Sequence, residues 1–134
     1  MGALQIRSDP ACAATVRHSL TDDLRRAGLT RTVTEDAALL ISELVTNAVR
    51  HATTPPSGYL SVSWQVDPDA VTVRVTDGGG PSRPRVRHVG GRSLSGRGLA
   101  IVAALADDWG VEEQAAEVTV WARLDRPADP AVGV

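Results

Sequence analysis

The sequence contains no lysine, and all 14 of its Lys/Arg-type residues are arginine. A Walker A phosphate loop, a Schiff-base enzyme and a protein-kinase-type site each need a lysine, so the sequence excludes all three. The codon bias of a GC-rich genome toward Arg, Ala, Gly and Val accounts for the absence most simply. The exclusion holds whatever the cause.

Cysteine and long apolar runs are also scarce. Cys12 is the only cysteine, which excludes an intramolecular disulfide and a Cys-based zinc cluster. No stretch approaches the ~18 apolar residues of a membrane span, and the N-terminus lacks the apolar core of a signal peptide. A net charge of −2 gives no support for direct nucleic-acid binding. We therefore expect a cytoplasmic protein that binds neither membrane nor nucleic acid.

The pattern of apolar residues predicts one α+β domain over 1–134, with its core in about 4–124 and a disordered tail at 126–134. Asp9-Pro10 reads as one helix start and Gly28 as its stop, and Thr32 to Glu35 resembles a capping box. A mainly antiparallel, mixed sheet with helices on one face is expected. The expected elements are strands at 3–7, 59–66, 70–76, 109–112 and 118–124, and helices after Pro10, from about Thr32, and at 99–106.

Three polar residues recur at helical spacing in the second expected helix. Glu43 and Asn47 are four residues apart and share a face, and His51 follows one turn later. A carboxylate and an amide oxygen at this spacing suit Mg²⁺, and the carboxylate can also accept a proton. A solvated polar face that ends in a histidine explains the same spacing, so the two interpretations stay open.

An aspartate follows the expected strand at 70–76. Asp77 precedes three glycines, which allow a ligand to approach the backbone closely. A carboxylate fixed there can accept a hydrogen bond from an exocyclic amine such as that of adenine. An ordinary Asp-Gly turn is the competing interpretation.

Glycines and an arginine open the short expected helix at 99–106. Unpaired N–H groups at a helix start, next to Arg97, favour the binding of a phosphate group. Residues 78–106 contain no Asp or Glu but five arginines, so this segment can attract a polyanion, although a solvated basic loop has the same composition. Those arginines are Arg83, Arg85, Arg87, Arg92 and Arg97.

Together, three segments resemble the GHKL ATPase superfamily, and in particular the bacterial anti-sigma-factor serine kinases. The segment from Glu43 to Ala52 resembles the N box of that family, and Asp77 to Gly80 its first glycine box. Residues 96–102 resemble the second glycine box, and residues 119–121 the closing strand. The resemblance spans roughly residues 4–124.

This resemblance implies a Bergerat fold, an α/β sandwich that binds ATP and Mg²⁺ under a lid formed by residues 81–95. It implies that Glu43 is the general base, that Asn47 ligates Mg²⁺ and that Asp77 binds the adenine amine. Further ATP contacts implied by the resemblance come from His51, Gly79, Gly96, Arg97, Gly98, Leu99 and Thr119.

Two positions depart from the family pattern. Pro81 stands where the first glycine box usually has a second glycine, and proline lacks an N–H and has a fixed φ. Glu117 and Val118 precede Thr119 where a glycine is frequent. Both departures are compatible with nucleotide binding, but they put tight binding and turnover in question.

The resemblance favours a serine/threonine kinase that phosphorylates a serine on an anti-sigma-factor antagonist in a partner-switching system. Its expected partners are that antagonist, a sigma factor, or both, and a homodimer is compatible with the resemblance. An alternative is a non-catalytic module that sequesters a regulatory protein in an ATP-dependent way. The catalytic domain of a sensor histidine kinase expressed alone is a third interpretation, but 134 residues leave no room for a phosphoacceptor helix pair.

Overall fold

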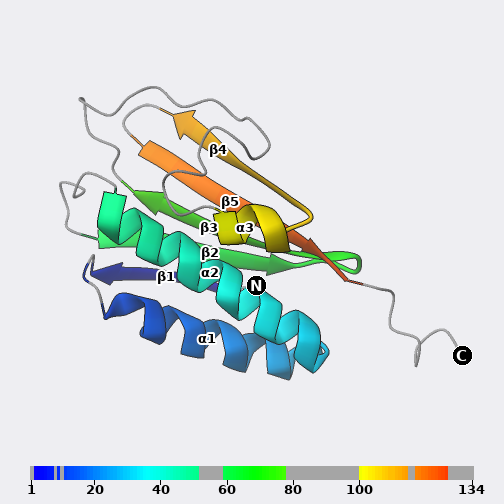
Figure 1. Cartoon of the computed structure of the whole chain (residues 1–134). Coiled ribbons are helices and arrows are strands. Elements are labelled where there is room, and N and C mark those ends of the chain that lie inside the picture. Colours follow the sequence, from blue (N-terminus) through cyan, green and yellow to red (C-terminus); the bar gives the residue numbers. More distant parts are fainter. Residues whose placement is uncertain are drawn as a thin grey trace, which may run out of the picture.

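The computed structural model of the chain describes residues 2–7, 9, 11–51, 59–77, 100–114 and 117–126, without the side chains of residues 50, 51, 113 and 114. In this part of the chain, three helices cover one face of a five-stranded sheet (Figure 1). The elements are β1 (Gly2–Arg7), α1 (Cys12–Arg26), α2 (Arg31–His51), β2 (Tyr59–Val66), β3 (Ala70–Asp77), α3 (Ala100–Leu105), β4 (Asp108–Gln114) and β5 (Glu117–Asp125).

The sheet has the strand order β1-β2-β3-β5-β4. All four pairings between these strands are antiparallel. The described sheet is therefore purely antiparallel, whereas a mixed sheet was expected. The β2–β3 hairpin turns at Asp67–Asp69, as the sequence predicts, and the Asp67 N–H donates to Ala70 O over 2.8 Å. The α+β class with helices on one face is confirmed.

Helix α1 begins later and ends where expected. Its N-cap is Ala11 and not Asp9, because the Asp9 carboxylate accepts the Ala11 N–H over 2.7 Å and holds a turn before the helix. At the other end Gly28 has a φ of +83°, and the Gly28 and Leu29 N–H groups donate to the carbonyls of Arg25 and Leu24. This is a Schellman motif, in which glycine removes the cost of a positive φ.

Helix α2 is capped by a different residue from the one expected. The Thr30 hydroxyl accepts the Val33 N–H over 3.2 Å, so the helix begins at Arg31 and the Thr32–Glu35 box does not form. Glu35 instead pairs with Arg31 over 3.1 Å on the exposed surface. The α2 helix continues to His51, and among the described residues no helix has the length and apolar character of a membrane span.

Alternation along the strands places one apolar row of each strand under the helices. On β3 the buried row is Val71, Val73 and Val75, while Arg74 on the other face is exposed. Helix α2 covers this row with side chains that are 0–1% exposed. These α2 side chains are Leu40, Ile41, Leu44 and Val45.

The N-terminal strand and α1 meet around a buried tryptophan. Trp64 is 3% exposed, and its indole N–H donates to Asp23 over 2.7 Å. A Cβ at Gly2 would lie 2.4 Å from the Trp64 ring, so this end of β1 requires glycine. Cys12 is buried in the same core, and this burial raises the pKa of its thiol above the ordinary value. The thiol is therefore a core group and not a reactive nucleophile.

Candidate functional site

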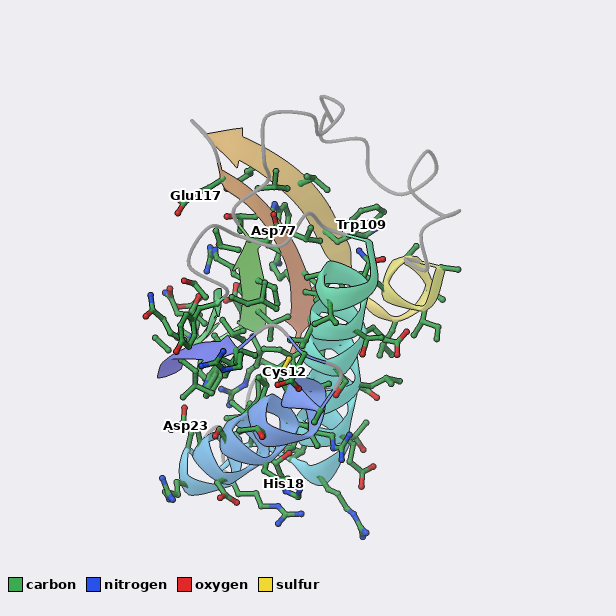
Figure 2. The ribbon with its side chains drawn as sticks, turned by 90° about the vertical axis from the view of Figure 1, so that its left-hand side faces the viewer. Cys12, His18, Asp23, Asp77, Trp109 and Glu117 are labelled. Carbon is green, nitrogen blue, oxygen red and sulfur yellow. The ribbon has the colours of Figure 1, made fainter. Side chains whose placement is uncertain are left out.

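Helix α2 and strand β3 run in the same direction, so their C-terminal ends reach the same edge of the fold (Figure 1). The two elements are packed against each other. Figure 2 shows Asp77, the last residue of β3, at the same end of the molecule as the C-terminal turns of α2. The structure therefore brings the C-terminal turns of α2 and Asp77 to one edge, as the sequence predicts.

Asn47 lies at the margin of the buried face of α2. Its backbone is helical, its side chain is half-buried, and its Oδ1 atom is inaccessible to solvent. Among the side-chain oxygens and nitrogens of the described residues, Oδ1 is the buried atom without a hydrogen-bond partner. A buried acceptor without a partner costs about 1–3 kcal/mol. An orphaned amide oxygen of this kind fits a ligand for a hard cation.

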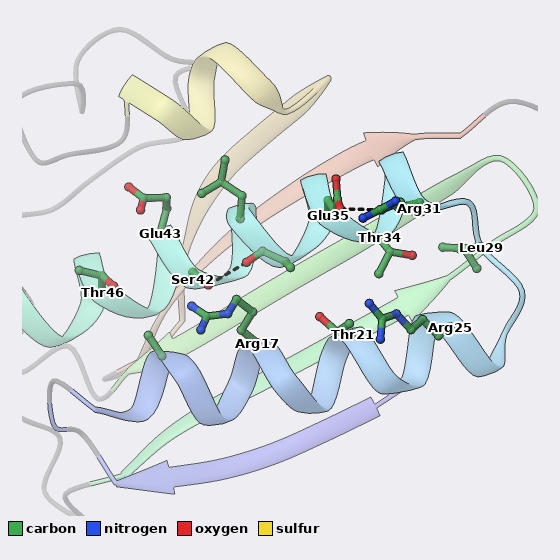
Figure 3. A pocket seen from close by; sticks show the side chains of 13 residues that line it. Arg17, Thr21, Arg25, Leu29, Arg31, Thr34, Glu35, Ser42, Glu43 and Thr46 are labelled. Carbon is green, nitrogen blue, oxygen red and sulfur yellow. Dashed lines mark hydrogen bonds and ion pairs between the residues drawn. The ribbon is translucent and has the colours of Figure 1, made fainter.

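Glu43 lies one helical turn before Asn47 and is half-buried. Its side chain points away from α1, toward the side of α2 on which α3 lies (Figure 3). Glu43 forms no ion pair within the described part of the chain. Its carboxylate is therefore not committed to a structural contact there, as a proton acceptor requires.

Asp77 closes the buried row of β3. It is 6% exposed and shares the helix-covered face with Val73 and Val75. Among the described residues it is the one carboxylate in the buried class. Burying a carboxylate is costly unless it interacts with a polar or charged group, and Asp77 has an interaction partner in the fold. Its place at the end of β3, beside α2, is the one expected for an adenine-binding acid.

Thr119 lies on the other face of the sheet. It pairs with Thr76 in the β3–β5 register, and the two hydroxyls are 2.7 Å apart. Asp77 pairs with Val118, so the helix-covered face at this edge carries Val118 and not Thr119. We therefore remove Thr119 from the candidate site and add Val118, which is 4% exposed. The alternation of Val118, Val120, Ala122 and Leu124 is the sequence signal that identifies this face.

Several expected site residues lie outside the described part of the chain. Helix α2 ends at His51, but nothing is described of this side chain. The expected lid at 81–95 and residues 127–134 of the expected tail also lie outside it. So do Gly79, Gly96, Arg97, Gly98 and Leu99. The expectations for these residues stay predictions.

Comparisons with known proteins agree with the described fold. Curated relatives include the serine-protein kinase RsbW of Listeria innocua and that of Listeria monocytogenes. Each is 29% identical over 117 residues, which covers 78% of this chain and 74% of the relative.

A solved structure of the RsbU and RsbW domains of Rv1364c from Mycobacterium tuberculosis has a TM-score of 0.66 and 24% identity. The similarity covers 96% of this chain and 34% of that one, so this chain spans about a third of its length. At this identity the comparison shows a shared fold.

The family comparison is more direct. Residues 6–124 match the family described as the histidine kinase-like ATPase domain. This range runs from β1 to β5 and contains all of the described helices. Because the match extends over nearly the whole chain, the protein belongs to the histidine kinase-like ATPase domain family.

Proposed function

We propose that this protein is a cytoplasmic, ATP-dependent serine/threonine kinase of the anti-sigma-factor type, whose substrate is a serine on an antagonist protein in a partner-switching system. Family membership supports an ATP site, and relatives named serine-protein kinases support transfer of a phosphoryl group to a serine. The observation that carries the proposal is the buried, unpartnered Oδ1 of Asn47, one turn from Glu43.

The residues present fit Mg²⁺. Mg²⁺ is commonly held by one or two protein oxygens together with phosphate oxygens and water. Within the described part of the chain, no group of three or more His, Cys, Asp or Glu side chains could hold a metal ion, so a site that relies on the nucleotide for most ligands is the suitable kind. Asn47 would supply the protein oxygen. Bound Mg²⁺ would neutralise charge on the phosphates of ATP.

The chain's own side chains divide the remaining work. Asp77 accepts a hydrogen bond from the exocyclic amine of adenine and orients the base at the edge shared by β3 and α2. Glu43 accepts the proton of the attacking serine hydroxyl. Positioning and electrostatics supply most of the catalysis in phosphoryl transfer, so the absence of lysine is no obstacle. Arg97 is proposed to offset charge on the phosphates.

A transfer assay with Glu43→Gln tests this assignment. The protein would be incubated with radiolabelled ATP, Mg²⁺ and an anti-sigma-factor antagonist from the same genome. We expect the variant to lose about 100-fold or more in transfer rate with ATP affinity little changed, because a general base contributes a factor of this order. Asp36→Asn is the matched control, since Asp36 is a half-buried acid on the same helix two turns earlier.

Two results would count against the proposal. Equal transfer by wild type and Glu43→Gln would remove the role of Glu43. A melting temperature that rises with ATP, without transfer to any candidate antagonist, would instead support the alternative of a module that binds ATP and sequesters a partner.

A further inference from the structure

A groove of about 830 Å³ runs between α1 and α2 on the side of the helices that faces away from the sheet (Figure 3). Ala13, Ala38 and Leu39 form part of its apolar lining, and Leu39 is 45% exposed. Polar groups from both helices line the rest. One end of the groove is at Glu43 and Thr46, and the other is at Leu29 and Arg31.

Two arginines of α1 line this groove. Arg17 and Arg25 are both exposed, and neither forms an ion pair within the described residues. Figure 3 shows Arg17 opposite Ser42 and Arg25 opposite Thr34. Arg31 differs because it already pairs with Glu35. The groove thus offers two uncommitted cations beside apolar surface, which is complementary to a chain that carries acidic and small apolar side chains.

The dimensions fit an extended peptide segment. From Arg31 to Thr46, α2 rises ~22 Å, a length that about seven residues of an extended chain would span. Arg17 and Arg25 are separated by ~12 Å along α1, so matching acidic side chains would stand about four residues apart. The segment's end nearest Arg17 would lie at the turn of α2 that carries Glu43, whose carboxylate points to the other side of this helix.

We propose that the α1–α2 groove binds an extended acidic segment of the protein substrate, next to the helix that carries Glu43. This inference rests on the proposed kinase function and adds the recognition element of its substrate. Arg17 and Arg25 form ion pairs with the acidic side chains, and the apolar lining contacts the residues between them. Nucleic acid is a poorer occupant, because Glu35 and Glu43 also line the groove and the chain has a net charge of −2.

The probe is a fluorescein-labelled peptide of about eight residues, with two glutamates about four positions apart and a serine next to one of them. A second peptide has glutamine in place of both glutamates. Fluorescence polarisation at low salt measures both against wild type and the Arg17→Glu/Arg25→Glu double variant. The matched control is Arg26→Glu, because Arg26 is an exposed arginine of α1 outside the groove.

We expect wild type and Arg26→Glu to bind the acidic peptide about tenfold more tightly than the glutamine peptide, and the double variant to lose this preference. The thermal melt without ligand should change only slightly, because all three arginines are exposed. Arg25 and Arg26 both lie in the last turn of α1, so the lost interaction with the helix dipole is matched between the double variant and the control. In the transfer assay the double variant should raise the KM for the antagonist and leave the KM for ATP unchanged.

The inference is overturned if wild type shows no preference, if the double variant keeps it, or if Arg26→Glu abolishes it equally. It is also overturned if the double reversal dissociates a wild-type dimer in sedimentation, since the groove would then join two copies. If Glu43-dependent transfer persists while the peptide preference is absent, the kinase proposal stands and the groove assignment falls. If ATP neither binds nor is consumed, the kinase proposal falls whatever the peptides do.

Discussion

Replacing Asn47 with leucine should make the nucleotide-free protein more stable and the nucleotide-bound protein less stable than wild type. The reason is the Oδ1 atom, which is buried without a hydrogen-bond partner. Leucine has a similar branched shape and needs no partner. If the amide is kept for a ligand, its removal should benefit the empty protein.

The magnitude follows from the burial of this group. An unsatisfied buried acceptor costs about 1–3 kcal/mol, and leucine is also the better helix former by a few tenths of a kcal/mol. Allowing for imperfect packing of the new methyl groups, we expect a gain of about 1–2 kcal/mol. For a chain of 134 residues this raises the melting temperature by about 3–8 °C.

With nucleotide bound, wild type should become more stable than Asn47→Leu. At a free Mg·ATP concentration 100-fold above the wild-type Kd, wild type gains about 2.7 kcal/mol. If loss of the metal ligand weakens binding about 100-fold, the variant gains only about 0.4 kcal/mol at that concentration. The two proteins would then differ by about 2.3 kcal/mol in their response to nucleotide.

Urea unfolding and thermal melts of both proteins, each with and without Mg·ATP, measure these four states. Leu39→Asn is a useful companion, because it places an amide at a largely exposed position of the same helix and should cost up to about 1 kcal/mol through helix propensity and lost burial. If Asn47→Leu is less stable than wild type without nucleotide, the amide makes structural bonds and the metal assignment loses its basis. An equal response of both proteins to Mg·ATP would refute it as well.

Two further predictions concern buried polar groups. Asp77→Asn should weaken ATP binding by about 10-fold or more in isothermal titration, because the amide replaces an ionised acceptor for the adenine amine; equal affinity would mean that adenine binds elsewhere. Asp23→Ala should lower the free energy of unfolding by about 1–2 kcal/mol in urea, because it leaves the buried Trp64 indole N–H without its acceptor. In a Trp64→Phe background the same substitution should cost clearly less, and an undiminished cost would assign the loss to another contact of Asp23.

The sequence predicts most of the secondary structure because its signals there are periodic and local. The alternation of 59–66 and 70–76 around Asp67-Pro68-Asp69 identifies the β2–β3 hairpin, and Gly28 marks the end of α1. Helix starts are less well predicted, because neighbouring polar side chains compete for the same N–H groups. Asp9 forms a turn before the helix, and Thr30 caps α2 ahead of Thr32.

The candidate site is predicted in part. The i, i+4 spacing correctly places Glu43 and Asn47 on one side of α2, and the strand end correctly places Asp77 at the same edge. The family resemblance implies an ATP contact from Thr119, whereas the alternation of β5 places Val118 on the helix-covered face. The α1–α2 groove has no sequence signal, because it depends on how two separate helices pack.

The pairing of β3 with β5 has a consequence for the order of folding. The β2–β3 and β4–β5 hairpins each close a short loop. The β3–β5 pairing that connects the two hairpins brings together distant parts of the chain, so it has the larger entropic cost. Asp77 and Val118 form the residue pair at one end of the β3–β5 pairing. An intermediate with two separate hairpins would therefore lack the edge proposed to bind adenine, so nucleotide would slow unfolding and leave the rate of folding almost unchanged.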